Sequence, residues 1–236
     1  MDIVYLYTAG ADTTEIRYSV RSISKHLTGF DNLYIIGDDP GIFKNVTVIP
    51  CEKRHKHNKA RNIYERILRA CQEGSISDHF FYNSDDIYLL RNYEARYFPY
   101  YYCNQLQDTF NAVSNKSTYK TYVEVTLKAL QERDLPTLNF NGHSPIVYHK
   151  GLYIDVMSQY DWEKSKGYIS KSLYCNTLKI HGVYQQDCKI HTPKTKTAIY
   201  RKIKDTPIFS TDDQAMNDPM RLVLQELYPE RSPWEI

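Results

Sequence analysis

The residues most able to do chemistry are two adjacent carboxylates, Asp85 and Asp86, which follow an apolar segment at residues 79–82. Two such groups at the end of a strand repel each other unless a cation neutralises them, and divalent cations prefer hard oxygen ligands. The pair therefore suggests a Mg²⁺ or Mn²⁺ site at which the metal would bridge a diphosphate. A solvated turn that ends a strand could carry the same residues, so the spacing leaves both interpretations open.

Arginines on two expected helices could bind a phosphate. Arg17 and Arg21 are four residues apart and share a helix face, so they could clamp a phosphate or merely flank an apolar stripe. Arg61 could contact a phosphate or a base, and Asn62 could fix the adjacent loop. A solvated helix face is the simpler interpretation of Arg61.

Three further residues could provide a base. His143 precedes an expected strand and could be a general base or a third metal ligand, although a lone histidine is more often structural. Asp212 and Asp213 follow the apolar residues 207–209 and form a second acidic pair. That pair could be catalytic, or it could be an acidic cluster ahead of a helix N-terminus.

Basic residues gather in two segments, 53–59 and 189–204. They could line a diphosphate cleft, contact a nucleic acid, or belong to solvated loops. The formal net charge of +2 is too small to indicate nucleic-acid binding by itself. The six candidate nucleic-acid contacts are Lys53, Arg54, Lys56, Lys194, Lys196 and Lys202.

The elements that must position these groups follow from the hydrophobic pattern. Apolar runs predict strands at residues 2–7, 33–36, 46–49 and 79–82, and helical spacing predicts helices at 14–28, with Thr13 as N-cap, and at 58–71. This β-α-β-β-α-β order indicates an α/β fold with a mostly parallel sheet flanked by helices. Ligands bind such sheets at the carboxyl ends of the strands. The loops at 8–12, 37–41 and 83–86 should therefore meet in one crevice, which makes Thr8, Gly10, Asp38 and Asn83 candidate donor-binding residues.

The second part of the chain has a weaker pattern. It predicts helices at residues 122–131, 151–160 and 220–227 and a strand at 146–148. We find no internal repeat and no linker, and 236 residues suit one large α/β domain, so we expect a single domain over residues 1–236.

Several protein classes are excluded or disfavoured by composition. Five scattered cysteines without a Cys-x-x-Cys pair argue against a disulfide framework and a zinc ribbon, and suggest reduced thiols. The N-terminus lacks the features of a signal peptide, and no apolar stretch approaches the ~20 residues needed to span a bilayer. We therefore expect a cytoplasmic protein with no transmembrane segment.

Several segments together resemble known sequences. Residues 60–62 (Ala-Arg-Asn) and 83–86 resemble elements of GT-A glycosyltransferases. A closer resemblance is to the Stealth family of sugar-phosphate transferases, carried by residues 2–5, 15–23 (Glu-Ile-Arg-Tyr-Ser-Val-Arg-Ser-Ile), 79–87 and 228–235. The chain departs from that family at residues 8–12 and 59–64, where the expected Gly-Ser-Asp or Asp-Gly and a helix-start glutamate are not matched.

The resemblance implies a transferase with a nucleoside-diphosphate-sugar donor. Asp85, with Asp86, would hold the metal against the donor diphosphate, and Arg17, Arg21 and Arg61 would support phosphate binding. His143 or Asp213 would deprotonate the acceptor hydroxyl. Residues 1–92 would form the nucleotide-sugar-binding half and residues 93–236 the acceptor half.

Three functions stay open at this point. Attack at the anomeric carbon gives a glycosyltransferase, which the Ala-Arg-Asn element and the departures favour. Attack at the β-phosphorus gives a sugar-1-phosphate transferase of the Stealth type. A non-catalytic polyanion-binding module is a third alternative, although it would not need the acidic pair. The acceptor could be a saccharide or, in a phage protein, a hydroxylated DNA base.

Overall fold

The computed structural model describes residues 1–10 and 12–236, so Ala11 of the predicted 8–12 loop lies outside the described residues. A five-stranded sheet runs through the molecule in the order β11-β5-β1-β3-β4. All neighbouring strands are parallel except β11, which is antiparallel to β5. The strands are β1 (Asp2–Tyr7), β3 (Leu33–Gly37), β4 (Thr47–Ile49), β5 (His79–Ser84) and β11 (Ile146–His149). This confirms the predicted α/β fold with a mostly parallel sheet.

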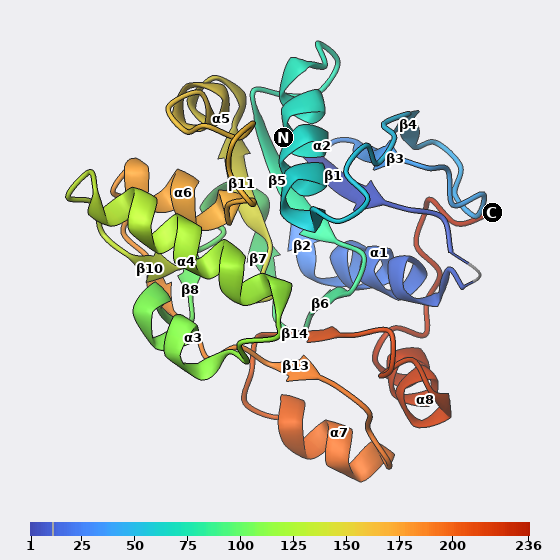
Figure 1. Ribbon diagram of the computed structural model, residues 1–236. Coiled ribbons are helices and arrows are strands. Elements are labelled where there is room, and N and C mark those ends of the chain that lie inside the picture. Colours follow the sequence, from blue (N-terminus) through green and yellow to red (C-terminus); the bar gives the residue numbers. More distant parts are fainter. Residues whose placement is uncertain (11) are drawn as a thin grey trace.

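Alternate residues of the central strands face two different hydrophobic cores. Ile3 and Tyr5 of β1 pack with helix α1 (Thr14–His26), through Ile16, Val20 and other residues. Val4 belongs to the other core, which includes residues of α2 (Lys59–Gln72), α4 (Thr118–Gln131), α5 (Lys150–Met157) and α6 (Ser170–Thr177). The period of two in a strand thus produces helices on both faces of the sheet (Figure 1).

A second, smaller sheet continues from the carboxyl end of β5. Its order is β13-β14-β6, formed by β6 (Ile87–Leu89), β13 (Lys189–Ile190) and β14 (Ile208–Thr211). Helices α7 (Lys196–Ile203) and α8 (Asp218–Leu227) pack beside it around the buried rings of Tyr88 and Phe209. The predicted basic segment 189–204 is therefore mostly an ordered strand and helix.

Short strand pairs complete the second half of the chain. These are β2 (Leu27–Thr28) with β7 (Tyr93–Glu94), β8 (Tyr101–Tyr102) with β12 (Val183–Tyr184), and β9 (Asn104–Gln105) with β10 (Leu138–Asn139). A short 3₁₀ helix, Ala95–Tyr97, and helix α3 (Leu106–Ala112) lie between them in the chain.

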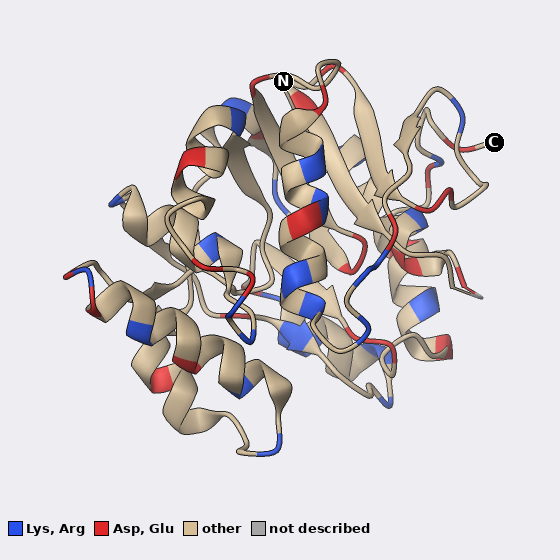
Figure 2. Ribbon diagram, turned by 45° about the horizontal axis from the view of Figure 1, so that its top comes forward, with Lys and Arg blue, Asp and Glu red and all other residues tan. Residues whose placement is uncertain are grey.

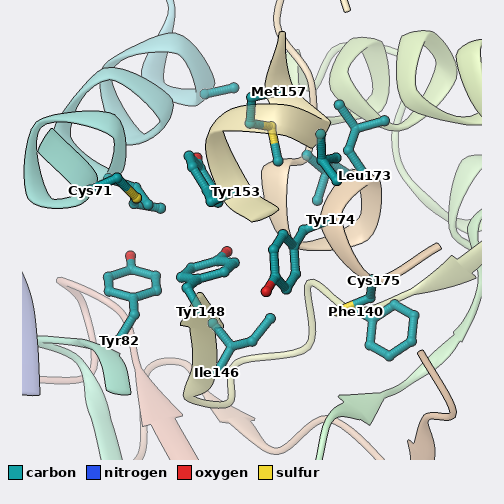
Figure 3. Packing of buried hydrophobic residues seen from close by; sticks show 14 of the residues in the cluster. Cys71, Tyr82, Phe140, Ile146, Tyr148, Tyr153, Met157, Leu173, Tyr174 and Cys175 are labelled. Atoms are coloured by element: carbon teal, nitrogen blue, oxygen red, sulfur yellow. The ribbon is translucent and has the colours of Figure 1, made fainter. Parts of the chain in front are cut away.

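Tyrosines fill much of the core between α2, α5 and α6. The rings of Tyr148 and Tyr153 have centroids 4.9 Å apart, and Tyr174 lies 4.9 Å from Tyr148. Figure 3 shows these rings gathered with Tyr82 between Cys71 and Cys175. The hydroxyls of Tyr148 and Tyr153 are buried and have no hydrogen-bond partner among the described residues.

Helix α1 is held by the segment at residues 228–235. Arg17 and Arg21 both form ion pairs with Glu235, whose carboxylate is fully buried. The next residue, Ile236, donates its N–H to the carbonyl of Ile42 at 3.1 Å. The two parts of the chain with the most specific family resemblance therefore bind each other.

Local details correct two expectations about α1. Thr13 is the N-cap residue, but its side chain makes no capping hydrogen bond, and Asp12 accepts from the Thr14 N–H at 2.9 Å instead. The helix ends at His26 because the chain enters strand β2 before Gly29. In residues 1–10 and 12–236, no helix combines the length and apolar character needed to cross a bilayer.

Candidate functional site

The carboxyl ends of β1, β3 and β5 bring the predicted loops together. Tyr7 at the end of β1 lies opposite Gly37 of β3, and Leu6 lies opposite Ser84 of β5. The Ala9 N–H donates to the Asp38 carboxylate at 2.8 Å, which joins the first two loops directly. The three predicted loops therefore lie at the same edge of the sheet.

Asp85 and Asp86 form the turn between β5 and β6, next to the end of β14. The Thr211 N–H donates to the Asp86 carbonyl at 3.0 Å, and the Thr211 hydroxyl donates to the Glu15 carboxylate at 2.8 Å. Burial raises the pKa of Asp85 to about 7, and the charges of Asp86 and Glu15 add to that rise. Burial, with the charges of Asp86 and Asp213, also raises the pKa of Glu15.

These shifts describe a group of carboxylates that repel one another, which a divalent cation would relieve. In the described part of the chain, no three His, Cys, Asp or Glu side chains are arranged as a ready metal cluster. Magnesium ions are commonly held by one or two carboxylates together with substrate phosphates and water. Asp85 and Asp86 fit that mode of binding, in which the donor completes the ligand set.

Asn83 has a structural position. Its side chain is fully buried and donates to the Tyr5 hydroxyl and the Ser19 hydroxyl, each at 3.1 Å. Ser19 in turn donates to the Ile87 carbonyl at 2.6 Å. Asn83 therefore fixes the acidic turn to helix α1, and we do not include it among the groups that contact a donor.

Asp212 and Asp213 lie beside the acidic turn but differ in their contacts. Asp212 pairs with His191 at 2.5 Å and accepts from the Ala215 N–H at 3.0 Å, so its carboxylate stabilises a turn. Asp213 is exposed and close enough to raise the pKa of Glu15. The structure thus brings both predicted acidic pairs to one place.

His143 lies in a network with Asp187, which the sequence did not indicate, and with Lys189, the first residue of the predicted basic segment 189–204. Asp187 accepts from His143 Nδ1 at 2.8 Å and from the His143 N–H at 3.1 Å. On the other side of the ring, Lys189 Nζ donates to Nε2 at 3.1 Å and lies 3.9 Å from an Asp86 carboxylate oxygen. A carboxylate on Nδ1 and a cation on Nε2 together select the tautomer with its proton on Nδ1.

A buried lysine supports the loop that carries His143. Lys171 Nζ donates to the Ser144 carbonyl at 2.6 Å and lies 5.5 Å from the centre of the Tyr82 ring. Burial lowers the pKa of Lys171 to about 8, while the charge of Asp86 acts in the opposite direction. No sequence motif marks this residue, because its neighbours come from β5 and from the loop after β10.

Arg66 joins the loop after β1 to the segment after β4, and the sequence did not indicate it. Its guanidinium is buried and donates to the Thr8 hydroxyl at 2.8 Å, the Tyr7 carbonyl and the Cys51 carbonyl. Its Nε has no hydrogen-bond partner among the described residues. Gly37 is required here because a Cβ would lie 2.1 Å from the Tyr7 carbonyl oxygen, whereas Gly10 lies in open space.

Three predicted phosphate-binding arginines have protein partners. Arg17 and Arg21 bind Glu235, at 3.1 and 2.7 Å, so their predicted role is replaced by a structural one. Two arginines four residues apart on a helix can bind a buried carboxylate as well as a phosphate, so their spacing does not distinguish the two partners. Arg61 pairs with Glu65 and Glu163 on the surface of α2, so it too has acidic partners in place of a phosphate.

The six predicted nucleic-acid contacts do not form one cationic surface. Lys196 pairs with Glu226, and Lys202 donates to the Lys189 carbonyl. Burial has the largest effect on the pKa of Lys53 and lowers it, and the charges of Arg66 and Lys59 lower it further. The charges of Asp38 and Asp85 act in the opposite direction but do not reverse the shift. Figure 2 shows basic and acidic segments interspersed over several helices and loops. The remaining three, Arg54, Lys56 and Lys194, are exposed.

Asn62 has the loop-fixing role predicted for it. Its side chain accepts from the His55 N–H at 3.0 Å and donates to the His55 carbonyl at 2.7 Å. Asn58 caps α2 by accepting from the Arg61 N–H at 2.9 Å. The Ala-Arg-Asn segment therefore positions the basic loop at the edge of the crevice.

No family model and no curated protein matches the chain. Among solved structures, the galactosyltransferase LgtC, solved with donor and acceptor sugar analogues, aligns over 98% of this chain and 96% of its own, with 12% identity and a TM-score of 0.50. Glycosyltransferase GlyE of Streptococcus pneumoniae TIGR4 aligns over 97% of this chain, with 11% identity and a TM-score of 0.42, and this chain spans 60% of its length. A glycosyltransferase involved in the glycosylation of the major capsid of PBCV-1 aligns over 97% of this chain and 98% of its own, with 12% identity and a TM-score of 0.39. The alignment with LgtC supports the predicted fold class: this chain has the α/β fold of a known galactosyltransferase.

Proposed function

We propose that the protein is a metal-dependent glycosyltransferase that moves a sugar from a nucleoside-diphosphate sugar to the hydroxyl of a saccharide. The observation that carries the proposal is the acidic turn of Asp85 and Asp86, placed at the carboxyl edge of the sheet within 3.9 Å of Lys189. The pKa values of Asp85 and Glu15 are raised, and such carboxylates at the carboxyl edge of a parallel sheet are typical of a functional site. The fold similarity to a galactosyltransferase agrees with this interpretation.

The donor would lie across the loops that follow β1, β3 and β5. Thr8 and Asp38 would bind its nucleoside, since they follow the neighbouring parallel strands β1 and β3, and the Ala9 N–H joins the two loops by donating to Asp38. Asp85 and Asp86 would hold Mg²⁺ or Mn²⁺, which supplies positive charge to the donor diphosphate when bound. Lys53 and Lys189 would add positive charge nearby.

In the proposed reaction the acceptor oxygen forms a bond to the anomeric carbon of the donor sugar. The bond from that carbon to the diphosphate oxygen breaks, and the nucleoside diphosphate leaves. His143 Nε2 takes the acceptor proton, while Asp187 holds the ring and stabilises the resulting cation. Lys189 must first move from Nε2, and the Asp86 carboxylate oxygen, 3.9 Å from its Nζ, is an alternative partner for its charge. We prefer His143 to Asp213 as base because only His143 has such an oriented partner.

The test is donor turnover with a panel of uridine diphosphate sugars. We expect Asp85→Asn to fold and to lower turnover at least ~100-fold. Asp218→Asn, an exposed carboxylate at the start of α8, is the matched control and should retain activity. Near-normal turnover in Asp85→Asn would remove the proposed site, and a wild-type protein that never uses a sugar nucleotide would favour the non-catalytic module.

Two experiments separate the remaining alternatives. A donor labelled at its β-phosphate transfers the label only if the protein is a sugar-1-phosphate transferase, so we expect no label in the product. Calorimetry with the donor should show tighter binding with Mn²⁺ than with EDTA, since the carboxylates repel the diphosphate without a cation. Equal affinity under both conditions would argue against a metal-bridged donor.

A further inference from the structure

Strand β12 carries unusual exposed apolar side chains, and the segment that follows it contains Asp187, which binds His143. Tyr184 is 62% exposed and Val183 is 46% exposed. Neither the Tyr184 hydroxyl nor the Gln186 side-chain amide has a hydrogen bond among the described residues. Exposed apolar groups that cluster near a polar hollow commonly mark a binding surface.

The position of the Tyr184 ring is fixed by the strand beneath it. Val183 and Gln185 donate their N–H groups to the carbonyls of Tyr100 and Tyr102, both at 2.9 Å. A Cβ at Gly182 would lie 2.7 Å from the Tyr102 ring and 2.9 Å from the Phe140 ring, so only glycine allows this close approach. The Tyr102 and Tyr184 rings then meet edge to face, with centroids 5.8 Å apart.

A small hollow is lined both by Tyr102, against which the Tyr184 ring packs, and by the proposed base His143. Its lining includes Tyr102, His143, Gln185, Gln186 and Asp187, and its volume is about 10 Å³. That volume admits about one water-sized group. A sugar ring could not enter the hollow, but one of its hydroxyls could, while the ring remained outside against Tyr184.

Side-chain contacts also link His143 in the lining of the hollow to the proposed metal site. His143 Nε2 lies 3.1 Å from Lys189 Nζ, which lies 3.9 Å from Asp86. A hydroxyl in the hollow would therefore lie beside the base and on the side of the acidic turn where the donor sugar is expected. The amides of Gln185 and Gln186 offer both donors and acceptors to neighbouring hydroxyls.

We infer that Tyr184, supported by Tyr102, is the stacking surface for the acceptor sugar, and that the adjacent hollow receives the attacking hydroxyl. This inference rests on the proposed glycosyl transfer and names the acceptor class as a pyranoside ring. Aromatic faces suit the C–H face of a sugar, and the amide and imidazole groups suit its hydroxyls.

The test is binding of simple glycosides without any donor. Saturation-transfer NMR with methyl β-D-galactoside, methyl β-D-glucoside and methyl α-D-mannoside should show transfer from tyrosine ring protons to at least one of them. Tyr184→Ala should weaken that binding about tenfold, which corresponds to about 1.4 kcal/mol, whereas Tyr184→Phe should retain it. Tyr200→Ala on α7, another exposed tyrosine, is the matched control and should bind normally.

Outcomes of this test are separate from those of the proposed function. Unchanged binding in Tyr184→Ala, or no binding of any of the three glycosides to the wild type, would overturn the inference even if donor turnover depends on Asp85. A wild type that binds glycosides through Tyr184 but never turns over a sugar nucleotide would instead overturn the catalytic proposal.

Discussion

Arg21 and Glu235, 214 residues apart in the chain, form a two-pronged ion pair with Nε to Oε1 at 2.7 Å and Nη2 to Oε2 at 2.8 Å. Arg21 also donates to the Tyr228 carbonyl at 3.2 Å, and Glu235 accepts from the Ser232 N–H at 2.9 Å. Paired charges that satisfy their remaining hydrogen bonds are the form in which ions are tolerated in a protein interior. Helix α1, which supports the acidic turn through Ser19, depends on this pair for its position.

Loss of this ion pair should lower the free energy of unfolding of the protein without weakening donor binding. We expect Arg21→Met to lower the free energy of unfolding by about 3 kcal/mol, because it leaves the buried carboxylate of Glu235 with Arg17 as its one remaining charged partner among the described residues. Urea unfolding measures this change. Glu230→Gln, an exposed change in the same segment, should stay within about 0.5 kcal/mol of wild type. Lost donor affinity in the folded fraction of Arg21→Met would instead return Arg21 to the donor site.

The same pair should give an acid-sensitive contribution to stability. Burial raises the pKa of Glu235, but hydrogen bonds from Arg21 and Ser232 and the arginine charges outweigh it and lower the pKa to about 2. The stabilisation is therefore complete above the ordinary pKa of 4.5 and is lost as pH falls towards 2. In Glu235→Gln this part of the acid dependence should disappear. Urea unfolding between pH 6 and 2 should therefore show that the free energies of unfolding of the variant and the wild type become more similar as pH falls.

Asp85 should show the opposite dependence. Because its pKa is raised to about 7, the folded metal-free protein favours the protonated acid, so its contribution to stability is lost as pH rises from 3.8 through 7. We expect the thermal stability of Asp85→Asn, relative to that of the wild type, to increase as pH rises from 5 to 8. Mn²⁺ should stabilise the wild type at pH 8 and have little effect on the variant. A difference that does not change with pH would contradict the raised pKa.

Asp187 should act on turnover through His143. Asp187→Asn leaves the imidazole without its charged partner, so we expect kcat to fall about 100-fold while the KM for the donor stays within about twofold. Asp187→Glu should recover part of the lost kcat, since a carboxylate is restored. Asp205→Asn provides the control at an exposed carboxylate. A rise in donor KM with kcat unchanged would show that Asp187 has no role in positioning the base.

Gly37 should tolerate no side chain. Its φ is +128°, and a Cβ would lie 2.1 Å from the Tyr7 carbonyl oxygen. We expect Gly37→Ala to cost at least ~3 kcal/mol in the free energy of unfolding, from combined strain and overlap. Gly10→Ala in the neighbouring loop meets nothing within 4 Å and should leave stability nearly unchanged. Thermal unfolding of the two variants, side by side, measures the contrast.

The sequence predicts the main sheet well because each of its central strands is a continuous apolar segment, and these segments pair with one another. The strand predicted at 2–7 is confirmed without change, and that at 79–82 extends by two residues into Asn83 and Ser84. The second sheet could not be predicted, since β13 has two residues and β14 has four, and β6 pairs with residues about 120 positions later. Such short segments carry too little periodicity to indicate a strand.

For the site, the sequence locates the acidic turn but not the groups around it. Asp85 and Asp86 are adjacent, so their repulsion can be read directly. Glu15, Asp187 and Lys189 acquire their roles only from folding, because each meets partners that are far away in the chain. The error at Arg17 has the same origin: its spacing from Arg21 predicts a shared helix face but not what lies opposite that face.

Ionisation of the tyrosines buried in the core can be used to follow unfolding of the protein at high pH. Burial raises the pKa of Tyr5, Tyr82, Tyr88, Tyr148 and Tyr153 above the ordinary value of 10. These phenols cannot ionise while the core is closed. Phenolate absorbance in a base titration should therefore rise in two stages: a gradual one from the surface rings, and a later cooperative step when opening of the core releases its protons together.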